Sequence, residues 1–324
     1  MDLSIKPSQG ADEFDAMLEQ AVRADELGFS GVYLSEHHGH PIYWPTPVLA
    51  LGAIASHTEH VDLGTAVKLL PLHNPVHLAG RVALLDRMSD GRARMGFGLG
   101  WDHDEFDAYG IPRSERGARM TEYLELMNDL FEPGPTTFDG DFYSFEDFEL
   151  FPRHASDPRP GLLVGGTSDQ AYHRATNLAD GWVSPGGELA ELAAYAEEYR
   201  DFADDPGDVV ITNQGTVVIE REEAALDGLR RLKRAFHEPL IERGHPYSPT
   251  QAELDEMLGS DFDGYVEERA LVAGTPDQAI EKLQRIEEAT GADEIVLRIS
   301  TCGLPKEEGL ETLELLAEDV LPSF

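Results

Sequence analysis

The sequence contains a single cysteine, Cys302, in 324 residues, which makes an internal disulfide impossible. No apolar run approaches the roughly 18 residues that a membrane-spanning helix needs, and the first residues lack the apolar stretch of a signal peptide. From these absences we expect a cytoplasmic protein that does not enter a membrane.

Positive charge is also scarce. Lys and Arg total 25 residues against 62 Asp and Glu, which gives a formal net charge of −37. The lysines are Lys6, Lys68, Lys233, Lys282 and Lys306. A surface this acidic repels phosphate backbones and anionic membranes, so we expect no nucleic-acid partner. Because lysine depletion accompanies the excess of carboxylates, we favour a halophilic protein over an acidic protein from ordinary salt.

What is present is enough apolar sequence for a large core, since 41% of the residues are hydrophobic. Short apolar runs alternate with helical periodicities along the chain. The predicted strands are Met1–Ile5, Gly31–Leu34, Val61–Leu69, Ala93–Gly98, Gly161–Val164, Gly181–Ser184, Val209–Ile219 and Glu294–Ile299. Eight strands separated by helices predict a closed α/β (β/α)₈ TIM barrel, with an open doubly wound sheet as the alternative.

Two segments interrupt this alternation. Residues 133–160 are rich in Pro, Gly and aromatic residues, and Asp139-Gly140 between two β-prone runs predicts a hairpin. Residues 221–272 are polar with a helical pattern. We therefore expect one barrel domain over residues 1–324, with these segments as insertions after strands four and seven.

The active site of such a barrel lies at the C-terminal ends of its strands. Strand two ends at His37, a candidate general base or hydrogen-bond donor, although a structural histidine is the alternative. His38 and His40 form an H-x-H pair of the kind that holds a metal in some barrels. Strands five to eight end without His and no Asp closes strand eight, so we expect no metal site.

Glycines mark two further strand ends. The run Gly96–Trp101 lacks the G-x-G-x-x-G spacing of a dinucleotide fingerprint, and its glycines instead predict a flat wall for a planar ring. The run Gly165–Ser168 joins a strand to a helix, where backbone N–H groups and two hydroxyls suit a phosphate. A plain turn with Ser168 as the helix N-cap is the alternative.

Two candidates remain for substrate contact. Trp44, like Trp101, is either an aromatic lid over a ring system or part of the core. Arg298 lies at the end of strand eight and is a candidate to hold an anionic group of substrate or cofactor, or to pair with a carboxylate.

The sequence resembles the bacterial luciferase-like flavin-dependent oxidoreductases over nearly its whole length. The stretches that carry this resemblance are GFSGVYLSEHH, HVDLGTAVKLLPLHNPVHLAGRVALLDRMSDGRARMGFGLGW, LLVGGTSDQAYHRATNLADGW and AGTPDQAIEKL. The resemblance implies a barrel that binds FMN, or coenzyme F420 in related branches, and that forms a homodimer. It also implies a small-molecule substrate and a flavin reductase as the partner that supplies reduced flavin.

The resemblance assigns roles to particular positions. It implies that His37 is catalytic, that the flavin phosphate lies near Gly165–Ser168, and that a cis peptide between Ala66 and Val67 backs the flavin ring. The cofactor-binding residues that we predict are Ala66, Val67, Gly98, Gly100, Trp101, Gly165, Gly166, Thr167 and Ser168.

Departures from the family narrow the function. Leu99 stands where bacterial luciferase has an arginine that reaches the phosphate, so other residues must anchor that group. Gln214 and Thr216 stand where the alkanesulfonate-cleaving branch has Arg and His, which argues against a sulfonate substrate. The resemblance does not imply light emission.

Three functions are open on this sequence. The first is a monooxygenase in which reduced FMN activates O₂ and the barrel orients the cofactor. The second is hydride transfer to or from F420 without O₂, with His37 as the base. The third is a flavin-binding protein without turnover.

Overall fold

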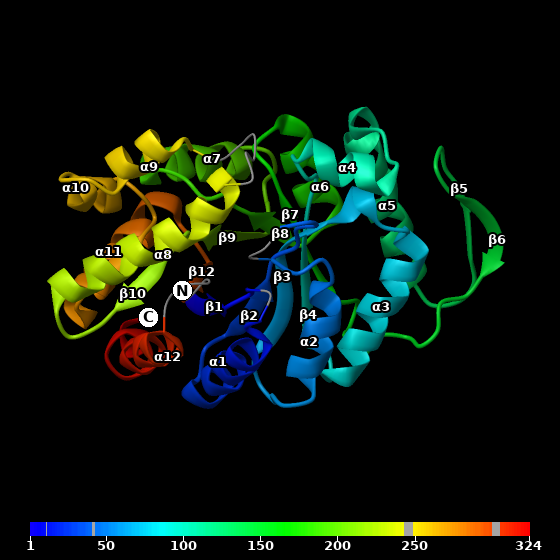
Figure 1. Ribbon diagram of the computed structural model, residues 1–324. Coiled ribbons are helices and arrows are strands. Elements are labelled where there is room, and N and C mark those ends of the chain that lie inside the picture. Colours follow the sequence, from blue (N-terminus) through cyan, green and yellow to red (C-terminus); the bar gives the residue numbers. More distant parts are fainter. Residues whose placement is uncertain (11, 41–42, 243–248, 300–304) are drawn as a thin grey trace.

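Eight parallel strands form a closed barrel at the centre of the computed structural model (Figure 1), which describes residues 1–10, 12–40, 43–242, 249–299 and 305–324. In order around the barrel the strands are β1 (Asp2–Lys6), β12 (Glu294–Arg298), β9 (Asp208–Thr212), β8 (Gly181–Val183), β7 (Gly161–Gly165), β4 (Ala93–Gly98), β3 (Asp62–Leu69) and β2 (Gly31–Leu34). The predicted closed barrel is confirmed, and the open sheet is wrong.

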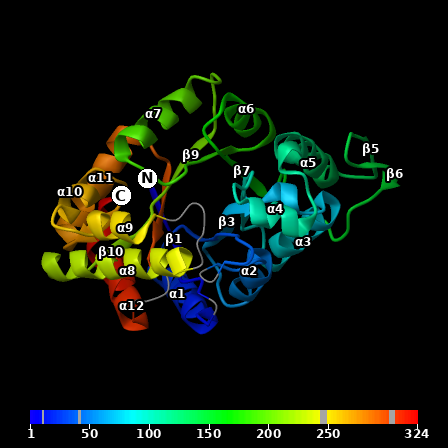
Figure 2. The same ribbon diagram turned by 45° about the horizontal axis from the view of Figure 1, so that its top comes forward.

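Helices surround these strands, with α8 to α12 on one side and α2 to α5 on the other (Figure 2). Their bounds are α1 Phe14–Leu27, α2 Pro47–Ala55, α3 Pro75–Met88, α4 His103–Tyr109, α5 Arg116–Phe131, α6 Asp169–Leu178, α7 Leu189–Arg200, α8 Glu222–Glu242, α9 Gln251–Met257, α10 Phe262–Glu267, α11 Pro276–Thr290 and α12 Lys306–Leu315. None of the helices in the described ranges is long and apolar enough to cross a membrane.

Short sequence signals set the helix ends. Asn74 caps α3 by accepting a hydrogen bond from the backbone N–H of His77 at 2.9 Å, and Pro75 follows in the first turn. Thr275 and Gln278 form a reciprocal capping box at the start of α11. Such caps satisfy backbone groups that a helix leaves unpaired, so α3 and α11 begin at defined points after their strands.

The seventh predicted strand, Val209–Ile219, is wrong in one respect, because it is two strands. Only β9 belongs to the barrel, whereas β10 (Thr216–Val218) pairs in parallel with β11 (Val272–Gly274) in a separate sheet. The break occurs at Asn213, whose side-chain amide donates to the Thr216 hydroxyl at 2.6 Å and closes a local turn. Segment 221–272 follows β10, contains α8, α9 and α10, and ends on the first residue of β11.

The predicted hairpin is present and stands away from the barrel (Figure 1). Its strands β5 (Thr136–Asp139) and β6 (Ser144–Phe148) pair antiparallel. Glu122 of α5 holds the connection, because its carboxylate accepts hydrogen bonds from three successive backbone N–H groups of the turn, those of Asp141, Phe142 and Tyr143.

A buried polar network occupies the N-terminal end of the barrel. Glu294, at the start of β12, forms an ion pair with Arg94 of β4 and accepts a hydrogen bond from the Tyr33 hydroxyl at 3.1 Å. Arg94 also pairs with Asp208 at 2.6 Å. These contacts cross-link strands from opposite sides of the barrel, so this end of the barrel is packed and charge-paired.

Candidate active site

A cavity of about 410 Å³ opens at the C-terminal ends of the barrel strands. Its volume lies in the range of about 300–1,000 Å³ that is typical of small-molecule and cofactor sites. The predicted site residues that line it are His37, Ala66, Val67, Gly98, Gly100, Trp101, Gly165, Gly166 and Arg298, and Leu99 and Gln214, the two departures from the family, line it as well. The structure therefore brings together residues from widely separated strand ends, as the barrel predicts.

His37 is held by a buried carboxylate. Its Nδ1 lies 3.1 Å from Oε1 of Glu105, whose side chain is almost wholly buried. The same oxygen accepts a hydrogen bond from the backbone N–H of His38 at 2.6 Å. A carboxylate at Nδ1 favours the tautomer with its proton on that nitrogen, which leaves Nε2 as the acceptor. Among the described residues, Nε2 has no hydrogen-bond partner.

The helix that carries Glu105 is absent from the sequence-based assignment. Asp102 caps α4 by accepting from the backbone N–H of Asp104 at 2.9 Å, and Gly110 ends it in the left-handed conformation. An N-cap aspartate and a terminal glycine eight residues apart are the signals that indicate this short helix. They do not indicate which of its acidic residues faces inward.

Glu36 is the centre of a second buried network. Its carboxylate accepts hydrogen bonds from Lys68 Nζ at 2.5 Å and from the backbone N–H of Leu69 at 2.8 Å, and it contacts His73 Nε2 at 3.0 Å. Burial raises the pKa of Glu36, but His73 and Lys68 outweigh burial and lower the pKa to about 2. Glu36 is therefore an ionised structural group that fixes the end of β2 beside His37.

The residues around Glu36 could also be considered as ligands of a metal ion. Ligand atoms of Glu36, His38 and His73 lie within 4.8 Å of one another, whereas His40 is not part of the group. The ammonium group of Lys68 already supplies the positive charge that a cation would bring to the carboxylate. His38 and His40 thus do not converge on one point, and Lys68 competes with any cation for Glu36. The absence of a metal site stays an expectation from the sequence.

The glycines at the ends of β4 and β7 form another part of the cavity wall. A Cβ at Gly98 would lie 2.6 Å from Val67 Cγ2, and a Cβ at Gly165 would lie 3.4 Å from Val67 Cγ1. The Ala66–Val67 peptide is cis, as the resemblance implies. The Ala66 carbonyl accepts hydrogen bonds from Lys6 Nζ at 2.6 Å and from Ser35 Oγ at 2.9 Å. The glycines thus leave room for the methyl groups of Val67, and a surface of glycines with small side chains suits the face of a planar flavin ring.

The predicted phosphate loop lies at one side of the mouth. Gly165 and Gly166 line the cavity, whereas Thr167 and Ser168 are exposed beyond it. Ser168 accepts from the backbone N–H of Ala171 at 3.3 Å and so is the N-cap of α6. Ser168 is thus a helix N-cap, and the phosphate role of this loop stays a prediction, which the first-turn N–H groups of α6 suit.

The two tryptophans differ. Trp101 lines the cavity, and its ring lies 5.5 Å from the ring of His37. Trp44 is not among the lining residues, because its indole N–H donates to the Gly10 carbonyl at 3.1 Å and its ring packs 6.0 Å from Phe14. Trp44 therefore packs against the core, the second of its two expected roles, and the neighbouring Tyr43 lines the cavity.

Arg298 is buried in the wall at the end of β12. Its Nη2 donates to the Tyr43 hydroxyl at 2.9 Å, and its guanidinium lies over the rings of Tyr43 and Phe236 at 5.7 and 5.5 Å. Its Nε has no hydrogen-bond partner among the described residues. Pairing with a carboxylate, the alternative fate for this residue, does not occur within the described part of the chain.

Sequence reasoning missed several residues of this site: Lys6, Ser35, Tyr43, Glu105, Ser184 and Asn213. A usable signal was the scarcity of lysine. Lys6, Lys68 and Lys233, three of five lysines in the chain, are buried rather than placed on the surface. A charged residue that is rare overall yet lies in apolar sequence next to a strand end marks a functional position.

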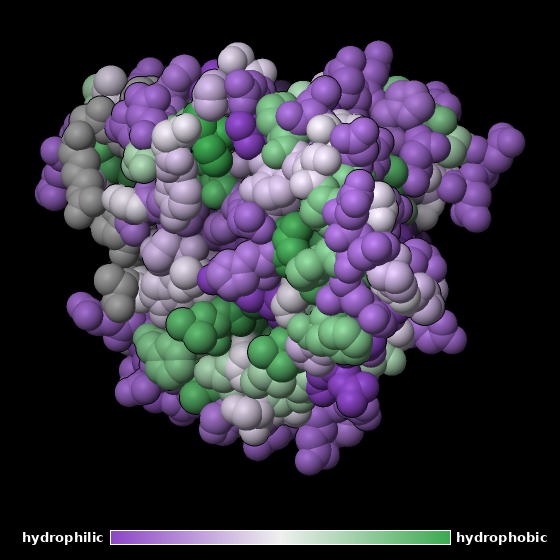
Figure 3. Space-filling view, turned by 90° about the vertical axis from the view of Figure 1, so that its right-hand side faces the viewer, coloured by the Kyte–Doolittle hydropathy of each residue, from purple (hydrophilic) through white to green (hydrophobic). Residues whose placement is uncertain are grey.

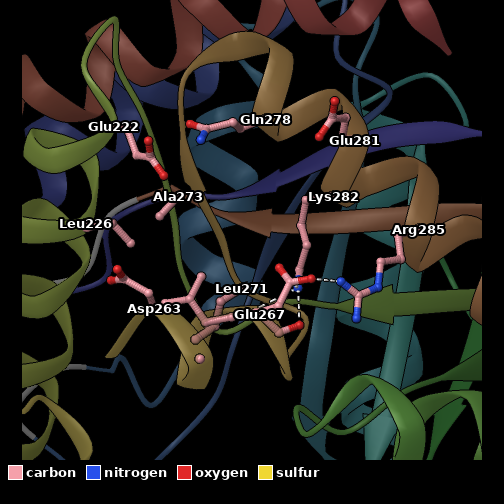
Figure 4. A pocket seen from close by; sticks show the side chains of 12 residues that line it. Glu222, Leu226, Asp263, Glu267, Leu271, Ala273, Gln278, Glu281, Lys282 and Arg285 are labelled. Carbon is pink, nitrogen blue, oxygen red and sulfur yellow. Dashed lines mark hydrogen bonds and ion pairs between the residues drawn. The ribbon is translucent and has the colours of Figure 1, made fainter. Parts of the chain in front are cut away.

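A second cavity, of about 510 Å³, lies outside the barrel between α8, α10, β11 and α11 (Figure 4). Its lining carries the carboxylates of Glu222, Asp263, Glu267 and Glu281. Its basic residues have local partners: Arg285 forms an ion pair with Glu267, and Lys282 donates to the Glu267 carbonyl at 2.6 Å. Sequence analysis predicts no site residue in this cavity.

Comparison with known proteins decides the family. The sequence matches the luciferase-like monooxygenase family over residues 2–294. The chain belongs to that family. In the first curated relatives, mycobacterial proteins of uncharacterized function, 30% identity extends over 50% of this chain and 64% of the relative. The chain thus spans less than two thirds of the length of these relatives.

Other matches extend over nearly the full chain. The flavin-dependent trigonelline monooxygenase, oxygenase component, of Acinetobacter baylyi is 25% identical over 96% of this chain and 90% of its own. The F420-dependent glucose-6-phosphate dehydrogenase of Amycolatopsis mediterranei is 28% identical over 95% and 94%. The crystal structure of monooxygenase RslO1 from Streptomyces bottropensis has a TM-score of 0.82, with 30% identity and 99% of both chains covered.

Proposed function

We propose that this protein is a flavin-dependent monooxygenase that oxygenates a small organic molecule at the mouth of its barrel. The observation that carries the proposal is the pairing of His37 with buried Glu105 at a cavity that Gly98 and Gly165 also line. The glycines suit the flat face of FMN, and His37 presents a proton-handling group at the same cavity. The likeness to a monooxygenase at 30% identity over the full chain supports this assignment.

When bound, reduced FMN supplies the electrons that activate O₂. The residues proposed to hold it are Ala66, Val67, Gly98, Gly100, Trp101, Gly165, Gly166, Thr167 and Ser168. The first-turn N–H groups of α6 bind the phosphate, in place of the arginine that Leu99 replaces. The barrel wall and Trp101 exclude water from the ring.

His37 is the proposed catalytic residue. Glu105 fixes Nδ1–H, so Nε2 faces reactants as an acceptor and returns a proton from the same atom. Because Glu105 is buried, water does not compete with His37 for a hydrogen bond to its carboxylate. In the alternative chemistry, F420-dependent hydride transfer, the same Nε2 removes the hydroxyl proton of an alcohol; the likeness to an F420-dependent dehydrogenase supports this second candidate.

The decisive experiment determines which cofactor the protein binds and whether its turnover requires O₂. Binding of FMN and of F420 is followed by fluorescence, and substrate turnover is then assayed with each reduced cofactor, with and without O₂. We expect FMN binding and turnover that requires O₂. Turnover with F420 in the absence of O₂ would move the assignment to the second candidate, and binding without any turnover across a substrate panel would favour a flavin-binding protein.

Positioning by Glu105 has its own test. Glu105→Gln should reduce turnover by about 10–100-fold while FMN affinity stays within threefold, because the amide no longer favours the productive tautomer. Tyr109→Phe is the matched control, since Tyr109 lies on the same helix but contacts His38 at 2.7 Å. Equal losses in both variants would assign Glu105 a structural role only.

We also propose a homodimer that docks through α2 and α3. Leu49, Leu84 and Met88 on these helices are 78, 48 and 50% exposed and surround an apolar hollow of about 470 Å³. The side of the molecule that carries α3 faces the viewer in Figure 3, where hydrophobic residues form patches within a hydrophilic surface. Sedimentation of the wild type and of Leu49→Glu tests this: we expect a dimer and a monomer.

The remaining features of the proposal follow from sequence and family. A separate flavin reductase supplies reduced FMN, since a full-length relative is named as an oxygenase component. The chain acts as one catalytic barrel in the cytoplasm of a halophilic cell, with segments 133–160 and 221–272 as insertions. Reconstitution with an NADH-dependent flavin reductase, in place of chemically reduced FMN, tests the partner.

A further inference from the structure

Three basic side chains at the barrel mouth are buried without an acidic partner. Lys6, Lys233 and Arg298 are 4, 4 and 8% exposed, and we call them the cation cluster. No carboxylate of the described residues lies within 4.0 Å of any of these three charges. Their contacts are to neutral oxygens, such as the Ala66 carbonyl for Lys6 and the Tyr43 hydroxyl for Arg298.

This lack of partners is not a consequence of a scarcity of acid. The chain has 62 Asp and Glu for 25 Lys and Arg, so a basic residue easily finds a carboxylate. Positions 11, 41–42, 243–248 and 300–304, which the structure does not describe, contain no Asp or Glu and so hold no further acidic partner. The cation cluster is therefore kept free of carboxylates in a chain full of them.

The cluster is assembled from three distant parts of the sequence. Lys6 ends β1 and is the register partner of Arg298 at the end of β12, so the two side chains leave neighbouring strands on the same side, and both line the cavity. Lys233 comes from α8 and donates to the Gln214 carbonyl at 3.0 Å. Like charges on paired strands repel each other, which a bound anion would offset.

Burial and the charge of Arg298 lower the pKa values of both lysines in the cation cluster. Burial, and secondarily the charge of Arg298, lowers the pKa of Lys6 well below its usual value. Burial likewise lowers the pKa of Lys233 to about 7, with Arg298 contributing. The Nε of Arg298 has no acceptor among the described residues. An unsatisfied guanidinium N–H beside like charges is a binding group whose partner comes from outside the chain.

Aromatic rings connect the cluster to the catalytic histidine. The Phe236 and Tyr43 rings lie 6.2 Å apart in an edge-on arrangement beneath the guanidinium of Arg298. The Tyr43 ring lies 4.9 Å from the ring of His37. A molecule with an acidic group at Arg298 and a flat ring along Tyr43 thus extends toward His37.

We propose that the substrate is a small aromatic carboxylate, whose carboxylate binds Arg298 within the cation cluster and whose ring packs along Tyr43 toward His37. This proposal rests on the function proposed above and names the substrate class. A planar guanidinium with an adjacent hydroxyl matches the two oxygens of a carboxylate. The cavity surface at His37 then receives the ring carbon or substituent that is oxygenated.

The cation cluster is distinct from the proposed phosphate position. It lies at β1 and β12, whereas Gly165 ends β7, which is four strands from β1 in either direction around the barrel. Two anion positions on opposite sides of one mouth fit a cofactor phosphate on one side and an acidic substrate on the other. The two positions are separable by mutation.

The test compares benzoate with benzamide, which has the same shape and no charge. Binding is measured by calorimetry at constant ionic strength, with FMN-loaded protein and again without FMN. We expect benzoate to bind at least tenfold more tightly than benzamide, and Arg298→Met to abolish this preference while benzamide binding stays within twofold. Lys233→Met, as a second variant, should weaken benzoate binding about threefold to tenfold. Arg285→Met in the second cavity is the matched control and should change neither affinity.

Outcomes separate this proposal from the function on which it rests. Equal affinity for benzoate and benzamide, absence of both, or a preference that survives in Arg298→Met would overturn the proposal. Tighter binding of phenyl phosphate than of benzoate would overturn the choice of a carboxylate. FMN affinity is measured in parallel: Gly165→Val should lower it and Arg298→Met should not. Loss of FMN binding in Arg298→Met would assign the cluster to the cofactor, whereas failure of FMN to bind the wild type would refute the flavin function alone.

Discussion

The buried charged residues at the two ends of β12 differ in whether they have a partner of opposite charge. At its N-terminal end, Glu294 is buried and paired with Arg94, which in turn contacts Asp208. At its C-terminal end, four residues later, Arg298 is buried with a neutral partner, the Tyr43 hydroxyl, and near two other cations. The same strand in the same chain thus carries a satisfied charge at one end and an unsatisfied charge at the other.

The difference separates stability from function. A paired and hydrogen-bonded ion network closes the N-terminal end of the barrel, where removal of one partner would leave a buried charge uncompensated. The mouth holds charges that cost free energy in the absence of a ligand, and such sites are typical of binding and catalysis. Variants at the two ends should therefore differ in which measurement they change.

The largest expected effect is on turnover at the mouth. His37→Asn should lower kcat by about 10²–10⁴-fold, the contribution of a positioned acid or base, while flavin affinity and the melting temperature stay near wild type. Tyr33→Phe at the opposite end, which removes a hydroxyl bonded to Glu294 and Arg94, should keep kcat within about threefold. Steady-state assays of both variants with saturating reduced flavin decide this. Full activity of His37→Asn would make His37 a structural residue.

Next in size is the stability contrast between two arginines. Arg94→Met leaves Glu294 buried without its counter-charge and should cost about 3–5 kcal/mol in the free energy of unfolding. Arg298→Met removes a buried charge that has no acidic partner and should be neutral or stabilising. Urea unfolding measures both. Comparable losses in the two variants would contradict the contrast between the ends.

The sequence predicts the barrel and part of the site, but not which buried charges are paired. Apolar runs and helix caps predict the barrel, because strand burial and capping are local properties of the residues. Strand ends then predict His37, the glycine wall and Arg298 as site residues. The pairing of Glu294 with Arg94 spans 200 positions, and whether a cation meets a carboxylate is decided by side-chain packing across the closed barrel.

The differences between the sequence-based expectations and the structure also arise from side-chain contacts that a sequence pattern does not show. The split of Val209–Ile219 depends on hydrogen bonds of Asn213, which an apolar run does not reveal. Trp44 and Tyr43 are adjacent, and only the path of the loop decides that Tyr43 contacts the cavity. Glu105 lies on a helix of seven residues, too short for a periodic pattern to indicate its buried face.

A smaller effect should appear as a pH dependence. Burial lowers the pKa of Lys233 to about 7 in the folded protein, below its usual value of 10.5. Between pH 7 and 10.5, Lys233 is protonated in the unfolded chain and deprotonated in the folded protein. The free energy of unfolding therefore rises with pH in this range. Below pH 7 the buried charge of Lys233 lowers the free energy of unfolding by its full amount. Lys233→Met should therefore stabilise the protein by about 1–3 kcal/mol at pH 6, and the gain should shrink toward pH 10. Urea titrations at several pH values check the trend, and a gain that is constant or grows with pH would contradict it.

The smallest expected difference between the two ends concerns salt. A net charge of −37 is carried mostly by the surface, and the Debye length falls from about 10 Å at 0.1 M to about 3 Å at 1 M salt. The wild-type melting temperature should therefore rise steadily from 0.1 to 2 M KCl, as we expect of a halophilic protein. Buried charges are screened much less, so Arg94→Met and Arg298→Met should show the wild-type slope although their melting temperatures differ. A flat wild-type curve would reject the halophilic expectation. A slope changed in one variant alone would show that the charges at that end of the barrel are open to salt, and would remove the distinction between a closed, paired end and a buried, unpaired mouth.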